Sequence, residues 1–112
     1  MQRLPAVLVQ NLQLTTSYVS YYPAPALTTT TISAFTLNNT TAGAATVNIS
    51  LVPSGGSQAD ANEVVTELSI AAKTSVAVPQ LVGQTIAAGG ALWMKASAAT
   101  AITPRVSGYE QS

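Results

Sequence analysis

Few residues of this 112-residue chain can do chemistry, because it contains no cysteine and no histidine. Without those side chains the usual zinc, haem and iron–sulfur sites cannot form, and disulfides are impossible. The commonest general base is also missing, which excludes serine–histidine and cysteine–histidine mechanisms. Ser54 and Ser57 therefore have no base to activate them as nucleophiles. We predict that the chain is not an enzyme and has no catalytic, cofactor-binding or metal-binding residues.

Two short motifs could still hold a ligand. Gly55, Gly56 and Ser57 resemble a phosphate-binding loop, but no Lys-Ser/Thr pair and no helical pattern follow them, so we predict a hairpin turn. Asp60 and Glu63 lie close to Asn62 and could offer oxygen atoms to calcium. They lack the acidic spacing of a dedicated calcium loop, which favours solvated loop residues.

Charge is the most unusual feature of the composition. Charged residues make up 7% of the chain, four basic and four acidic, so the net charge is zero; a typical soluble domain has about 25% charged residues. A neutral chain has no electrostatic surface for phosphate backbones or membrane surfaces, so we predict neither nucleic acid nor membrane as a partner. The hydrophobic fraction of 47% supports a core and argues against disorder. So few charges indicate a surface covered by partners.

No segment predicts a signal peptide or a membrane span. Residues 1–10 contain one positive side chain, Arg3, followed by a short apolar stretch interrupted by Pro5. No apolar run approaches the roughly 18 residues that cross a bilayer. Glycosylation sequons begin at Asn38, Asn39 and Asn48. Without a secretory signal we do not expect them to be used.

Short strand-like runs separated by turn residues make up the chain. The clearest run is 46–52, in which apolar and polar residues alternate with period two. Residues 64–70 can be a strand or a helix, and their β-branched content favours the strand. Further strands are predicted at 12–19, 28–37, 75–78, 81–86, 91–97 and 101–109. Two prolines predict a break at residues 21–25, and Pro104 predicts an edge strand or a bulge.

These seven or eight short strands predict an all-β protein. Turn signals every 8–12 residues or so are typical of an antiparallel β-sandwich with immunoglobulin-like or jelly-roll connections. Residues 12–112 form a single domain in this interpretation. Residues 1–11 are either an N-terminal arm that adds a strand to a neighbouring subunit, through residues 7–10, or the first strand of the chain's own sandwich. The predicted inward-facing residues are Val47, Ile49, Leu51, Leu68, Ile70, Leu92, Met94, Ile102 and Val106.

The outward-facing residues of the same pattern predict an interface. In the strand at 91–97, Leu92 and Met94 alternate with Trp93 and Lys95. We predict that Trp93 faces outward as an interface anchor; the alternative is that Trp93 faces the core and its neighbours face outward. The full set of predicted interface residues is Val7, Leu8, Val9, Trp93, Lys95, Arg105 and Tyr109.

Several segments resemble small β-sandwich structural proteins of tailed bacteriophages. The strand and hairpin at 48–57, with its Val-Pro-Ser-Gly-Gly turn, is similar to a hairpin in that family. So are the turn at 68–74, the glycine turn at 88–90, the Lys-Ala-Ser-Ala segment at 95–98 and the Ser-Gly-Tyr-Glu segment at 107–110. The resemblance covers roughly residues 30–110 and carries no catalytic or binding motif.

This resemblance implies a virion component assembled in the host cytoplasm. The expected role is a capsid decoration or head-fibre type protein that forms a homotrimer and binds the major capsid or other virion proteins. A neck, tail or fibre-attachment subunit is the alternative within the same class. A carbohydrate-binding or adhesin module is the alternative of another class, although aromatic residues make up only 5% of the chain.

Overall fold

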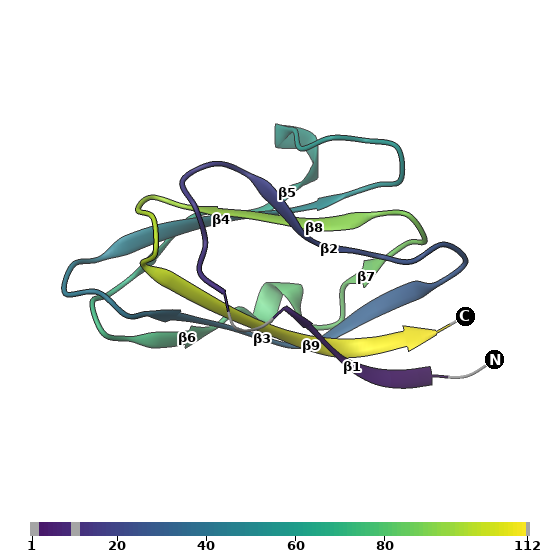
Figure 1. The fold of residues 1–112 in the computed structure, drawn as a ribbon, viewed down its shortest axis with the longest axis horizontal. Helices are drawn as coiled ribbons and strands as arrows, with labels where there is room; N and C mark the ends of the chain where they lie inside the picture. The colour runs from purple at the N-terminus through teal and green to yellow at the C-terminus, as the bar shows by residue number, and fades with distance from the viewer. Residues whose placement is uncertain (1–2, 10–11, 112) are drawn as a thin grey trace.

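The computed structural model describes residues 3–9 and 12–111, which form two antiparallel sheets packed face to face (Figure 1). The first sheet has the order β1-β9-β3-β6, with β7 also paired to β3. Its strands are β1 (Arg3–Val9), β9 (Ile102–Gln111), β3 (Thr29–Asn39), β6 (Ser75–Ala77) and β7 (Thr85–Ile86). The predicted β-sandwich is confirmed.

The second sheet has the order β2-β8-β4-β5. Its strands are β2 (Val19–Pro23), β8 (Ala91–Ala96), β4 (Ala45–Val52) and β5 (Glu63–Ile70). Two single turns of 3-10 helix, η1 (Asp60–Asn62) and η2 (Pro79–Leu81), interrupt the connections between strands. Among the described residues there is no helix long and apolar enough to cross a membrane.

The core lies between the sheets and follows the predicted alternation. In β8, Leu92 and Met94 are fully buried, whereas Trp93 and Lys95 are only partly buried, which confirms the predicted faces of this strand. Leu51 and Leu68 are half-buried and pack against the core from its margin. The other predicted core residues are fully buried: Val47, Ile49, Ile70, Ile102 and Val106.

A bulge interrupts the alternation of β5. Leu68 pairs with Val47 but Val65 pairs with Ile49, so β5 holds one residue more than β4 over this span. The extra residue lets Val65 and Ile70 both face the core, although they are an odd number of positions apart. Glu67 lies within the bulge with a left-handed φ of 49°.

The predicted strand at 12–19 is wrong. These residues form the irregular connection between β1 and β2, and Leu14 is fully buried because it closes one end of the sandwich. The Leu14 N–H donates to the Ile102 carbonyl at 2.9 Å. The strand instead covers residues 19–23 and so includes part of the predicted break at 21–25; Pro23 is tolerated because β2 is an edge strand.

Pro104 does not mark an edge strand, because β9 lies between β1 and β3. The β1 register ends at Val106, so Pro104 pairs only with β3, opposite Leu37. Its missing N–H therefore costs no hydrogen bond to β1.

Residues 3–9 form a strand of the chain's own sheet. Val7 pairs with Ser107 and Val9 with Val106, both on β9 of the same chain. The remaining residues of the predicted arm, Met1, Gln2, Gln10 and Asn11, lie outside the described residues.

Candidate functional sites on the two outer faces

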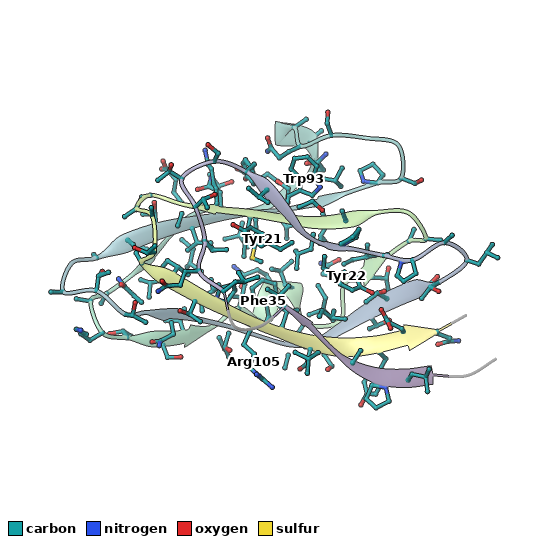
Figure 2. The ribbon with its side chains drawn as sticks, in the orientation of Figure 1. Tyr21, Tyr22, Phe35, Trp93 and Arg105 are labelled. Carbon is teal, nitrogen blue, oxygen red and sulfur yellow. The ribbon has the colours of Figure 1, made fainter. Side chains whose placement is uncertain are left out.

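The predicted interface residues divide between the two outer faces and the core. Trp93 and Lys95 lie on the outer face of the four-stranded sheet, and Arg105 and Tyr109 on β9 of the other sheet. Figure 2 shows Arg105 directed away from Phe35, which lies between the sheets. Two residues of the set, Leu8 and Val9, are buried in the chain's own core, so the structure corrects their assignment to an interface.

Trp93 is half-buried by neighbouring residues of its own chain, so less of its side chain is exposed than an interface anchor would need. It pairs with Ser20 on β2 and Ser50 on β4, and the segment after β4 returns to contact Ser50. The Gln58 amide of that segment donates to the Ser50 hydroxyl at 3.3 Å. The Trp93 Nε1 atom is buried and has no hydrogen-bond partner among residues 3–9 and 12–111.

A hydrogen-bonded network on the same face centres on the Glu63 carboxylate. It accepts hydrogen bonds from the Thr66 and Tyr18 hydroxyls, and from the Asn48 amide at 3.3 Å. The hydroxyl of Thr66, followed by that of Tyr18, stabilises the anion and lowers the pKa of Glu63. The Ser50 hydroxyl donates to the Tyr18 oxygen at 3.3 Å, which fixes the ring from a second direction.

The Tyr18 ring in turn supports Lys95. The Lys95 Nζ lies 5.1 Å from the centre of the ring, a cation–π contact. Beside it is a polar hollow of about 200 Å³, lined by Thr16, Thr46, Asn48, Glu67, Lys95, Ala96 and Ser97. The hollow thus brings one carboxylate, one ammonium group, one amide and several hydroxyls to one place.

The outer face of the five-stranded sheet carries a different hollow. Val7 and Tyr109, predicted separately as interface residues, both line it. Its volume is about 290 Å³, and its lining is Pro5, Ala6, Val7, Ser33, Ser107, Gly108 and Tyr109. These residues carry no charge, and Val7 is 45% exposed. The hollow suits an apolar contact.

A polar contact that no sequence pattern predicts joins the two sheets. The Tyr22 hydroxyl donates to the Glu110 carboxylate and lies 2.7 Å from the Thr30 hydroxyl, so β2 is joined to β3 and β9. Burial, followed by the hydrogen bond with Glu110, raises the pKa of Tyr22 to about 12. No sequence signal marked Tyr22, because the neighbouring prolines predicted a break there.

The Gly55–Ser57 motif forms the predicted turn, but the expectation of solvated loop residues is wrong for Glu63, which begins β5 and accepts hydrogen bonds there. The Gly56 N–H donates to the Pro53 carbonyl at 3.0 Å and Gly55 has a φ of 76°, as a tight turn requires. The Asn62 side chain bonds the backbone of Ser57 and Ala59. Among the described residues, no three acidic, histidine or cysteine side chains are grouped to hold a metal ion.

Sequence signals for the polar hollow were weak. The alternation at 91–97 predicts that Lys95 faces outward, whereas Asn48 is marked only as the start of a glycosylation sequon and Glu67 by no site motif. Asn48 could have been found from the alternation of 46–52, which places it on the outer face. Glu67 could not, because its position depends on the β5 bulge.

Comparison with known proteins supports the fold but does not assign the chain to a family. No protein-family model and no curated protein match the chain. The chain is similar to one in the structure of infectious bursal disease virus, Gx strain, with a TM-score of 0.56 and 13% sequence identity. The match covers 97% of this chain and 31% of that chain. At this identity the likeness shows that the two share a fold.

Proposed function

We propose that the chain is a non-enzymatic structural component of a virion. The observation that carries this proposal is the shared sandwich, because the match to a chain in a virus structure covers 97% of this chain. The finer assignment to a capsid decoration or head-fibre type protein of a tailed phage rests on the resemblance of segments such as 48–57. A neck, tail or fibre-attachment subunit is the alternative.

The outer face of the five-stranded sheet supports a role in assembly. Val7 and Tyr109 line an uncharged hollow there, so a partner can cover it without burying an unpaired charge. The proposed partners are further copies of the chain, as a homotrimer, and the major capsid or other virion proteins. Pro5 on the edge strand β1 disfavours strand addition, so we propose contact through the sheet face.

Sedimentation of the full chain tests this proposal. We expect a stable homotrimer that Val7→Glu converts to a monomer, because a carboxylate in the hollow would be buried without a partner. Ser69→Glu, at an exposed position on the other sheet, should leave the oligomer intact. A wild-type monomer at high micromolar concentration contradicts the proposed assembly. Genes for capsid, portal or tail proteins beside this one would support the virion role, and their absence would oppose it.

A further inference from the structure

Glu67, which lines the polar hollow on the four-stranded sheet, has an unusual backbone conformation. Four described residues other than glycine have a left-handed φ, and three of them, Leu27, Lys73 and Thr100, lie outside the strands. Glu67 is the one that lies within a strand. Glu67 adopts a left-handed conformation in the bulge, which glycine or asparagine would adopt with less strain. The fold therefore accounts for the bulge, but it does not explain why the residue in the bulge is a glutamate.

The bulge places the Glu67 carboxylate at the hollow that Lys95 also lines. Bulges commonly re-aim a side chain in this way. The Lys95 ammonium lies over the Tyr18 ring, and its charge also acts on the nearby Glu63 carboxylate. The network around Glu63 holds that ring in place through the Tyr18 hydroxyl. The hollow thus has an acceptor in Glu67 and a pre-positioned donor in Lys95.

Asn48 adds a further group of defined orientation. Its amide nitrogen donates to Glu63 at 3.3 Å, which fixes the side chain and directs its donor away from a ligand. The carbonyl oxygen of the amide can then accept a hydrogen bond. The Ser97 hydroxyl is fixed as well, because it accepts from the Thr46 N–H at 2.9 Å.

We propose that this hollow binds a single ring of a neutral saccharide. A hydroxyl group both donates and accepts, so one pair of neighbouring sugar hydroxyls can donate to Glu67 and accept from Lys95. A neutral ligand is favoured, because Glu67 would repel an anion and Lys95 a cation. The volume of about 200 Å³ is below the roughly 300–1,000 Å³ of pockets for drug-sized ligands. This proposal does not depend on the virion assignment.

Backbone amide NMR of the full chain tests the proposal. The probes are methyl β-glucopyranoside, methyl β-galactopyranoside and N-acetylglucosamine, with glycine as a zwitterion and acetate as an anion. We expect at least one sugar to shift the amide signals of Asn48, Glu67 and Ser97, with a dissociation constant on the order of 1–10 mM. Glycine and acetate should not shift them.

Substitutions separate binding from folding. Glu67→Gln and Lys95→Met should each weaken sugar binding at least about tenfold, the loss expected for one charge-assisted hydrogen bond. Glu67→Asn, which tolerates the left-handed backbone, should also weaken binding while keeping the melting temperature. Arg105→Gln, on the other sheet, is the matched control and should bind normally.

Three results would overturn the proposal. One is that no sugar shifts the signals, and another is that glycine alone does, which would assign the hollow to an amino acid. The third is that Arg105→Gln weakens binding as much as Glu67→Gln does.

Discussion

At the scale of single residues, the Tyr22 hydroxyl joins the two sheets through Thr30 and Glu110. Tyr22→Phe should lower the free energy of unfolding by about 1–3 kcal/mol, because the buried Thr30 hydroxyl loses its acceptor and Glu110 a donor. Because the pKa of Tyr22 is raised to about 12, folding favours the neutral phenol. Its stabilising contribution should be present up to about pH 10 and lost as the pH rises through 12. Ultraviolet titration should show a phenol step near pH 12 that Tyr22→Phe lacks.

Two inward positions of β4 differ in burial, and we expect substitutions at them to differ in their effect on stability. Ile49 is fully buried, whereas Leu51 lies half-buried at the margin of the core. Ile49→Ala should cost about 2–5 kcal/mol of unfolding free energy in a urea titration. Leu51→Ala should cost markedly less, because solvent can enter the space that it leaves. Equal losses at both positions would show that the margin of the core is packed as tightly as its centre.

At the scale of elements, the edge strands of both sheets have features that disfavour pairing with a further strand. Pro5 lies in β1 and Pro23 in β2, and neither can donate a ladder hydrogen bond. The edge strand β5 is interrupted by the bulge at Glu67, and β6 has only 3 residues. These features oppose the hypothesis that residues 7–10 add a strand to a neighbouring subunit.

Deletion of residues 1–10 tests the role of β1. The deletion removes Leu8 and Val9 from the core and leaves one side of β9 unpaired. We expect the truncated chain to lose cooperative thermal unfolding when this is followed by circular dichroism. A truncated chain that stays folded but no longer forms oligomers would instead support the intersubunit arm.

The strands and the site differ in how far the sequence predicts them. The alternation of Val47 and Ile49, and of Leu92 and Met94, predicts both inner faces, since period two reports burial directly. The same rule fails where a residue is buried outside a sheet. Leu14 contributes to an alternating pattern that predicts a strand, but it is buried because it closes the end of the sandwich. The polar hollow depends on the register of β4, β5 and β8 and on the bulge, which no local pattern encodes.

At the scale of the whole molecule, the low charge indicates which kind of interaction should stabilise the proposed oligomer. With zero net charge and 7% charged residues, the copies neither attract nor repel each other strongly over long range. The proposed contact surface around Val7 and Tyr109 has an uncharged lining. Its stability should therefore come from removing apolar area from water, which salt screening does not weaken.

We therefore expect the oligomer to be insensitive to sodium chloride. Between about 0.05 and 0.5 M, where the Debye length falls severalfold, sedimentation equilibrium should give dissociation constants that agree within about twofold. Sodium sulfate should tighten the oligomer, because excluded salts strengthen apolar burial. Dissociation at high sodium chloride would contradict this mechanism, because it would mean that ion pairs carry the contact. Arg105, exposed on the same sheet face, would then be the first residue to substitute.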